Sequence, residues 1–346
     1  MKIAFFSTNL AFCRHILDEL NRHHTVKMWA NNPNVQIRWA NTVKMLDWCD
    51  AAYLEWTQAP NIEISQIQGN TKPLITFCHG IDVMYHIFVD WRNITGLIIQ
   101  DAHYPRLLRL RAEWTKNNPD RPPLTKLPKN ILIKSLGVDL QTFTPPQQPA
   151  PGYHIVMHAS WIVPVKRIYA AIQQYYDLIQ LDGDKPWRMT LIGRWEGRYK
   201  VEERQEYLVA CRELIEQLDF PPDRLLIKPE NFPQSVWADF AKTADLYWCT
   251  SWRESFGLSM AEVCASGGYP LLNNYLGADK VYPEKYRCKT PYEMVQKTIE
   301  WGALSLEEKV RERRVIREHI EQFDAKKSAR EIRLFIEKIV ENHRVG

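Results

Sequence analysis

The sequence predicts an α/β protein with two doubly wound parallel sheets, and three observations support this. Short apolar runs alternate with amphipathic stretches from the first residues onward. The alternation stops once, where four prolines lie within residues 145–151, and then resumes. The 346 residues also suffice for two domains of similar size. Because parallel strands need crossover helices, we expect two sheets, each covered on both faces, that face each other across a cleft.

The apolar runs of the first half are short enough for buried strands, and one longer stretch has apolar residues at helical spacing. We expect strands at 3–6, 25–29, 51–54, 74–77, 97–99 and 131–133, and a helix at 10–20. The other intervening segments are long enough for crossovers. The proline-rich segment 144–152 then reads as a linker between domains.

The second half repeats the same rhythm. We expect strands at 155–158, 189–192, 225–227, 246–249 and 270–272, and helices at 168–179, 201–218, 235–241 and 258–265. The predicted domains are an amino-terminal domain over 1–148 and a carboxyl-terminal domain over 149–320. Residues 321–346 are expected to form a helix that packs back toward the first domain, because Ile332, Ile336 and Ile339 fall on one helical face.

Composition excludes several classes of protein. The 45 Lys and Arg nearly balance the 41 Asp and Glu, which disfavours nucleic acid as the main partner. Seven scattered cysteines without a C-x-x-C pair favour reduced thiols in a cytoplasmic protein over disulfides or a zinc site. No apolar run is long enough to span a bilayer. The chain is poor in glycine, with 14, and rich in aromatic residues.

The segment 252–262 carries the strongest chemical signal. Glu254 and Glu262 have seven residues between them and flank a turn that leads from a strand into a helix. Backbone amides at Gly257, Leu258 and Ser259 would start that helix and form an anion site. Two carboxylates around such a turn could accept hydrogen bonds from hydroxyl groups on both sides of a diphosphate, as in a nucleotide sugar. The alternative is that both glutamates are solvated residues at a helix start.

A second anion signal follows the first strand of the second half. Lys166 and Arg167 lie where a helix begins, which disfavours cations unless an anion lies beside them. Alone, this pair would more often be an exposed basic pair. Two such signals after two strands of one sheet favour a shared anion site.

These segments resemble the glycosyltransferases of the GT-B fold, specifically family four, whose members are mostly retaining and use nucleotide sugars. Gly137-Val138-Asp139 resembles the hinge signature of that family, and Lys166 resembles its phosphate-binding lysine. Leu191-Ile192-Gly193, the stretch from Glu254 to Glu262, and Gly268-Tyr269-Pro270 follow in the family's order. In the first half only His79-Gly80 matches. The resemblance runs from about residue 74 to the end.

The resemblance implies two Rossmann-like domains and transfer of a hexosyl group from a nucleotide diphosphate sugar, with retention, no metal and no further cofactor. The acceptor, a saccharide, a lipid-linked glycan or another molecule, stays open, as do base and sugar. Glu254 would hold the donor sugar, Glu262 the ribose, and Lys166 the diphosphate. The implied site residues on the donor side further include Phe256, Gly257, Leu258, Ser259, Arg167 and Gly193; His79 would be catalytic, and Asp82 and Asn9 would lie on the acceptor side.

Two departures from the family pattern leave alternatives open. Trp161 stands where the family has an arginine, and Arg167, Arg194 or Arg253 could supply that charge. The first turn, at residues 7–10, lacks glycine, so backbone there cannot approach a diphosphate closely. The alternatives are a GT-B binding or accessory protein without transfer activity, or an epimerase or phosphorylase of this fold. A packed, hydrogen-bonded histidine is the less favoured alternative for His79.

The remaining signals are weaker. Arg106, Arg109 and Arg111 alternate with leucines and could touch an anionic membrane face, but a solvated helix start is favoured. Asp182-Gly183-Asp184 imitates a metal-binding D-x-D sequence, yet it lies between a helix and a strand and is interpreted as a turn.

Overall fold

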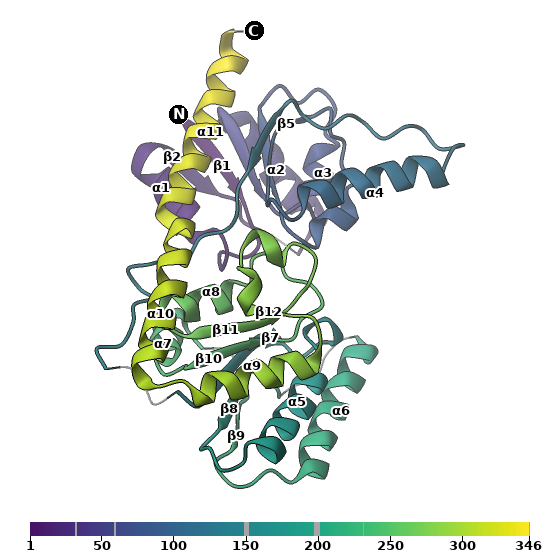
Figure 1. Ribbon diagram of the computed structural model, residues 1–346. Helices are drawn as coiled ribbons and strands as arrows, with labels where there is room; N and C mark the ends of the chain where they lie inside the picture. Colours follow the sequence, from purple (N-terminus) through teal and green to yellow (C-terminus); the bar gives the residue numbers. More distant parts are fainter. Residues whose placement is uncertain (32, 59, 149–151, 197–200, 231, 346) are drawn as a thin grey trace. The chain divides into compact units, whose positions relative to one another are not determined.

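The computed structural model describes residues 1–31, 33–58, 60–148, 152–196, 201–230 and 232–345 (Figure 1). The chain divides into two compact units, the first made of residues 1–137 and 325–346 and the second of residues 138–324. Each unit contains one sheet of six strands, and the paired strands run parallel. The expected class, α/β with two doubly wound parallel sheets, is confirmed.

The sheet of the first unit has the strand order β2-β1-β3-β4-β5-β6. Strands β2 and β3 lie on opposite sides of β1, so the order in which strands are added across the sheet reverses after β2. The β1–β2 and β2–β3 connections must therefore cross opposite faces of the sheet. The elements of this unit are β1 (Lys2–Phe6), α1 (Arg14–His23), β2 (Thr25–Met28), α2 (Val35–Trp48), β3 (Ala51–Glu55), α3 (Asn61–Ser65), β4 (Leu74–Cys78), η1 (Asp82–Tyr85), β5 (Ile94–Ile99), α4 (Tyr104–Asn117), β6 (Asn130–Ile133) and α11 (Ala325–Val345).

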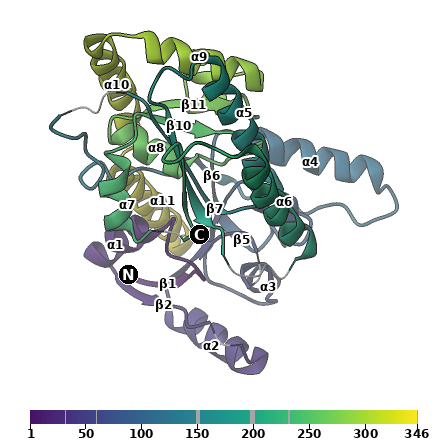
Figure 2. The ribbon, with the colours of Figure 1, turned by 90° about the horizontal axis from the view of Figure 1, so that it is seen from below.

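Successive side chains of the strands point to opposite faces of the sheet and pack into a core on each face. Ala4 and Phe6 point to the face covered by α2, α3 and α4, where they cluster with Leu46, Ile64 and Leu107. Helices α1 and α11 cover the other face and contact each other (Figure 2). The guanidinium of Arg333 on α11 donates to Glu19 on α1 over 2.9 Å. The carboxyl-terminal helix is therefore an integral part of the first unit.

The sheet of the second unit has the strand order β12-β11-β10-β7-β8-β9. Strands β7 and β10 are neighbours at the centre of this sheet. From β7 the chain adds β8 and β9 toward one edge, and from β10 it adds β11 and β12 toward the other. The elements are β7 (His154–Trp161), η2 (Pro164–Lys166), α5 (Ile168–Leu181), β8 (Arg188–Arg194), α6 (Glu202–Leu218), β9 (Leu225–Lys228), α7 (Gln234–Ala241), β10 (Leu246–Cys249), α8 (Leu258–Ala265), β11 (Tyr269–Asn273), η3 (Ala278–Lys280), η4 (Glu284–Tyr286), β12 (Arg287–Cys288), α9 (Pro291–Ala303), α10 (Leu306–Ile320) and η5 (Glu321–Phe323).

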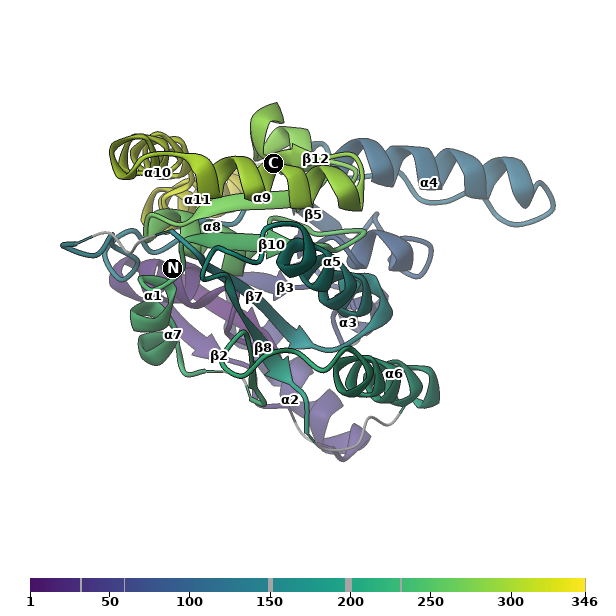
Figure 3. The same cartoon turned by 60° about the horizontal axis from the view of Figure 1, so that its bottom comes forward.

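Helices cover both faces of the second sheet (Figure 3). Helix α5 contacts both α6 and α9, and these helices share a core with β7 and β8 that includes Ile155, Met157 and Trp187. Helices α7 and α10 each contact α8, which packs on β10 and β11. Segment 182–184 forms a turn before β8, and the indole Nε1 of Trp187 donates to Asp182 over 2.8 Å. The turn interpretation of Asp182-Gly183-Asp184 is confirmed.

The chain enters the second unit before the proline-rich segment, whereas the sequence places the domain boundary at 148/149. Val138 and Phe143 are fully buried. The amide of Val138 donates to the carbonyl of Phe323 over 2.8 Å, and Arg317 Nη1 donates to the carbonyl of Phe143 over 2.6 Å. These apolar contacts and hydrogen bonds attach residues 138–148 to the second unit. Residues 149–151 of the predicted linker lie outside the described residues. The chain returns to the first unit at Ala325, four residues after the expected 321.

Two further expectations concern the chain as a whole. All seven cysteines are among the described residues and are buried, free thiols, as expected. In the described part of the chain, no helix has the length and apolar character needed to cross a membrane.

Candidate functional site

The loops after β7 and β10 meet at the point where the second sheet changes direction. The chain leaves β7 toward β8 and leaves β10 toward β11, so the two connections diverge. Ligands of open α/β sheets bind in the crevice that such diverging loops leave at the carboxyl ends of the strands. Both segments singled out in the sequence, one ending at Lys166 and one containing Glu254, lie in these two loops.

Lys166 and Glu254 form an ion pair between these loops. Lys166 Nζ donates to Glu254 Oε1 over 2.5 Å, and the hydroxyl of Ser251 donates to the same oxygen over 2.7 Å. Burial alone would lower the pKa of Lys166, but the charge and hydrogen bond of Glu254 outweigh it and raise this pKa above its ordinary value. Lys166 is therefore charged at neutral pH and stays partly accessible, with its side chain 27% exposed.

Backbone hydrogen bonds hold the two loops in register. The hydroxyl of Thr250, the first residue after β10, donates to the carbonyls of Lys166 and Arg167 over 2.9 and 3.2 Å. The amide of Trp252 donates to the carbonyl of Val165 over 3.0 Å. Because Thr250 is fully buried, its hydroxyl is shielded from water. The ion pair thus rests on a fixed framework.

Helix α8 begins directly after the loop that carries Glu254. Gly257 precedes it in the left-handed conformation, with φ +72°, which glycine adopts without strain. Among the described residues no side chain caps this helix, and its first turn contains no acidic residue. The first amides of a helix have no intrahelical acceptor, so those of Leu258 and Ser259 can bind an anion. Phe256 anchors the turn by burying its ring against Phe323.

Glu262 lies one turn inside α8 and is buried, with only 8% of its surface exposed. It accepts a hydrogen bond of 2.7 Å from the indole of Trp237. Burial raises the pKa of Glu262 to about 8, because the Trp237 hydrogen bond offsets only part of the desolvation. Its carboxyl group is therefore largely protonated at neutral pH. The interpretation of Glu262 as a solvated helix-start residue is wrong.

Arg194 lies beside Trp161, at the position where the resemblance leads us to expect an arginine. Trp161 and Arg194 are register partners in the β7–β8 pair, and the guanidinium lies 4.3 Å from the Trp161 ring. Arg167 lies 5.7 Å from the ring of Trp252 instead. Of these two cations, the structure thus associates Arg194 with Trp161. Stacking on an indole stabilises a guanidinium without neutralising its charge.

Gly193 has a packing reason for being glycine. A Cβ at this position would collide with the carbonyl oxygen of Ala159 on the neighbouring strand β7. The residue is buried inside the sheet, immediately before Arg194. Its predicted place on the donor side stays a prediction, and the geometry gives it a structural role.

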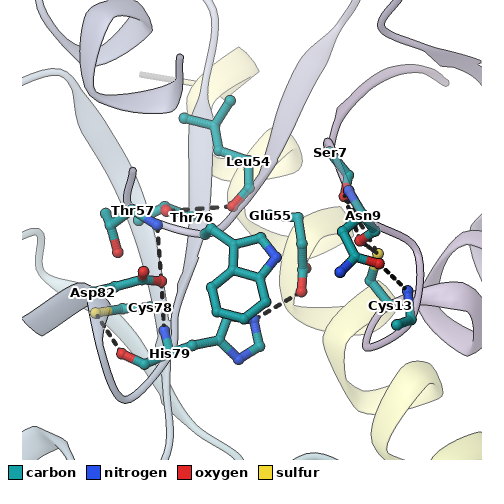
Figure 4. A network of polar contacts seen from close by, with 12 residues as sticks. Ser7, Asn9, Cys13, Leu54, Glu55, Thr57, Thr76, Cys78, His79 and Asp82 are labelled. Atoms are coloured by element: carbon teal, nitrogen blue, oxygen red, sulfur yellow. Dashed lines mark hydrogen bonds and ion pairs between the residues drawn. The ribbon is translucent and has the colours of Figure 1, made fainter. Parts of the chain in front are cut away.

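His79 follows β4 in the first unit and is enclosed by other side chains (Figure 4). It is 1% exposed, and its Nε2 lies 2.7 Å from Oε1 of Glu55. The rings of Trp56 and Phe77 lie 4.2 and 4.4 Å from the imidazole. This environment matches the packed, hydrogen-bonded histidine, and the catalytic role of His79 stays a prediction.

Asp82 and Asn9 hold loops at the same end of the first sheet. Asp82 is fully buried and accepts hydrogen bonds of 2.9 Å from the amides of Thr57 and His79 (Figure 4). Burial raises its pKa, and these hydrogen bonds limit the rise. Asn9 is exposed, and its side-chain oxygen accepts from the amide of Ala11 over 2.9 Å. The predicted acceptor-side role of both residues stays a prediction.

Sequence reasoning missed Glu55, which ends the otherwise apolar strand β3 and is fully buried as a side chain. Its second oxygen accepts a hydrogen bond from the hydroxyl of Tyr53. A carboxylate at the carboxyl end of a buried strand was the available signal. Within the described residues, no group of three or more His, Cys, Asp or Glu side chains could hold a metal ion.

Comparison with known proteins finds similarity in structure alone. No family model matches the chain, and no curated protein matches it in sequence. Among solved structures, the trehalose-phosphate synthase (UDP-forming) of Burkholderia vietnamiensis is similar with a TM-score of 0.71 and 11% identity, covering 99% of this chain and 96% of that one. An E. coli structure described as trehalose-6-phosphate bound with UDP-2-fluoro glucose gives 0.73 and 12%, covering 98% and 99%.

The sucrose-phosphate synthase of Thermosynechococcus elongatus is similar with a TM-score of 0.69 and 12% identity, over 99% of this chain and the whole of that one. At such identity the likeness concerns the fold, not the reaction. It agrees with the two Rossmann-like six-stranded sheets found in this chain. The chain therefore has the GT-B fold.

Proposed function

We propose that the protein is a glycosyltransferase that moves a hexosyl group from a nucleotide diphosphate sugar to an acceptor. The observation that carries this proposal is the ion pair of Lys166 and Glu254 at the switch point of the second sheet. The pair places one cation and one carboxylate beside the uncapped start of α8. The solved structures of similar fold include proteins named for sugar transfer that involves UDP, which supports the same class of donor.

Each group would contact one part of the donor. Lys166 and the amides of Leu258 and Ser259 would bind the diphosphate, which accepts hydrogen bonds and carries negative charge. Glu254 would accept hydrogen bonds from hydroxyl groups of the transferred sugar. Glu262, held by Trp237, would bind the ribose hydroxyls. Arg194, stacked on Trp161, would supply the second cation for the diphosphate.

Departure of the nucleoside diphosphate is the step that these groups would assist. Negative charge grows on the leaving phosphate oxygen as the glycosidic bond breaks, so oriented donors stabilise the transition state more than the ground state. Lys166 is held in its charged form by Glu254 and needs no proton transfer before acting. We propose that this chemistry proceeds without a metal ion and with retention of configuration at the anomeric carbon.

The proposal is tested by incubating the full chain with a panel of nucleotide sugars and following release of the nucleoside diphosphate. We expect release from one donor class, stimulation by an acceptor, and unchanged rates in the presence of a chelator. Glu254→Gln should lower turnover more than it lowers affinity for the free nucleotide, because Glu254 is assigned to the sugar.

The outcomes separate the alternatives. Nucleotide binding without release of diphosphate would indicate a GT-B binding or accessory protein. Release of free sugar or of an epimer without an acceptor would indicate an epimerase or phosphorylase. Loss of activity in chelator would reject the metal-free mechanism. Restoration of activity by one divalent ion would then identify the metal that the enzyme requires.

A further inference from the structure

The first unit contains a cavity of its own at the carboxyl ends of β1, β2 and β3. Its volume is about 220 Å³. Strand β1 lies between β2 and β3, so the chain direction changes here as it does between β7 and β10 in the second unit. The lining includes Ser7, Thr8 and Asn9 after β1, and Glu55, Trp56 and Asn61 around the end of β3.

Glu55 is the one charged residue among the described residues that line this cavity. Its carboxyl group lies 2.7 Å from the buried imidazole of His79 (Figure 4). It also accepts a hydrogen bond from the hydroxyl of the buried Tyr53. No lysine or arginine belongs to the described lining. A phosphate or carboxylate entering the cavity would therefore meet no lysine or arginine among the described lining residues to offset its charge.

Trp56 forms an aromatic wall in a backbone conformation that bulky residues rarely adopt. Its φ is +73°, in the left-handed region. Asn61 Nδ2 fixes this conformation by donating to the carbonyls of Glu55 and Trp56 over 2.6 and 2.8 Å. The half-buried indole packs against His79 in a tilted arrangement and meets Phe12 edge-on. Such strain persists where the surrounding structure enforces it, and it is concentrated at ligand sites.

Asn61 also presents an acceptor that lacks a donor. Its side-chain Oδ1 is buried, and among the described residues it has no hydrogen-bond partner, although the residue is only 5% exposed. A ligand that donates hydrogen bonds would satisfy this oxygen. The carboxyl group of Glu55 could accept further hydrogen bonds from the same ligand. Hydroxyl groups donate and accept, whereas an ionised phosphate or carboxylate only accepts.

We propose that this cavity binds an uncharged polyhydroxylated molecule, a sugar or polyol that carries no phosphate or carboxylate. An indole wall suits the apolar face of a sugar ring, and the polar lining suits its hydroxyl groups. The inference rests on the proposed function only in identifying this ligand as the acceptor. It predicts a neutral acceptor, although solved structures of similar fold include synthases named for phosphorylated sugars.

The test is calorimetric titration of the full chain with glucose, galactose, mannose, maltose and myo-inositol, and with the 6-phosphates of the three hexoses. At least one neutral compound should bind, and its phosphate ester should bind at least tenfold more weakly. Equal or tighter binding of the esters, or binding of none of the neutral compounds, would overturn the inference. Titration with a nucleoside diphosphate in parallel reports on the second unit, so failure of the donor proposal is seen separately.

Two pairs of variants localise the effect. Trp56→Gly removes the indole and suits the left-handed backbone, so neutral-sugar binding should fall at least tenfold, whereas Trp39→Ala on α2, 44% exposed, should leave it unchanged. Thr8→Arg adds a cation to the cavity and should raise affinity for the hexose 6-phosphates about tenfold. Thr71→Arg, exposed just before β4, should not. Equal effects within either pair would contradict the assignment.

Discussion

At the scale of single residues, two buried carboxyl groups are held in opposite ways. Glu55 is hydrogen-bonded to the imidazole of His79 and accepts a hydrogen bond from the hydroxyl of Tyr53. Glu262 accepts one hydrogen bond from a neutral indole, and burial raises its pKa to about 8. For Glu262, one hydrogen bond from a neutral indole offsets only part of the desolvation, so the acid form is favoured.

The raised pKa of Glu262 predicts a pH-dependent cost in stability. A carboxyl group with a folded pKa of about 8 and an ordinary value of 4.5 ionises more easily in the unfolded chain. The free energy of unfolding therefore loses nothing through this ionisation below about pH 4.5. Between pH 4.5 and 8 it falls by at most about 1.4 kcal/mol per pH unit, and above pH 8 the loss levels off. Glu262→Gln removes this ionisation and keeps an acceptor for Trp237.

The variant should therefore unfold at the same temperature as the parent near pH 4.5 and at a progressively higher temperature up to pH 8. Thermal melts of both proteins at four pH values measure this difference, and other titrating groups cancel in the comparison. A constant difference across the range would show that Glu262 is not protonated in the folded protein.

The positions of Lys166, Glu254 and Gly257 in loops after strands could be predicted, because each residue belongs to a local strand–loop–helix pattern. The loop after a parallel strand and the first turn of the next helix have positions that sequence alone indicates. The environment of His79 could not be predicted in the same way. Its partner Glu55 lies 24 residues away on another strand, and only the strand register brings the two together.

At the scale of elements, two cases show how burial affects agreement with the sequence. Strand β10 and helix α8 begin and end where the apolar pattern places them, and nearly all of their residues are buried. Helix α2 was not predicted as a helix, and only Thr42 and Leu46 of its 14 residues are buried. A helix that buries so little of its surface leaves little apolar periodicity to detect. Tertiary contacts, not pattern, decide such elements.

Helix α11 packs so closely on β5 that the strand requires a glycine. A Cβ at Gly96 would collide with Cδ1 of Ile339 and lie 3.2 Å from the ring of Phe335. Gly96→Ala should therefore cost about 1–3 kcal/mol through overpacking. Ile339→Val removes the colliding methyl group, so the double variant should regain part of that loss.

A double-mutant cycle in urea measures the coupling between the two positions. We expect the cost of Gly96→Ala to be smaller in the Ile339→Val background than in the parent. Additive costs would mean that the helix shifts away from the strand and that the packing of α11 on β5 is looser than described.

At the scale of the whole molecule, two sheets of the same type could be predicted, but the unit boundary could not. Prolines mark where regular structure stops, whereas the boundary depends on where Val138 and Phe143 are buried. The return of the chain at Ala325 has the same origin, because Asp324 still bridges to Val138. Local composition reports backbone geometry, and only packing assigns a segment to a unit.

The central claim is that a nucleoside diphosphate binds at the carboxyl edge of the second sheet through Lys166. Calorimetry with UDP, GDP and ADP, on the parent chain and on Lys166→Met, tests it most directly. Lys242→Met is the matched control, because Lys242 also forms an ion pair but precedes β10 and so lies at the amino edge of the same sheet. We expect one diphosphate to bind the parent and the control equally, and to bind Lys166→Met about 10- to 150-fold more weakly, which corresponds to a charge-assisted hydrogen bond of about 1.5–3 kcal/mol. Equal affinity of Lys166→Met and the parent, or no binding of any of the three diphosphates, would contradict the claim.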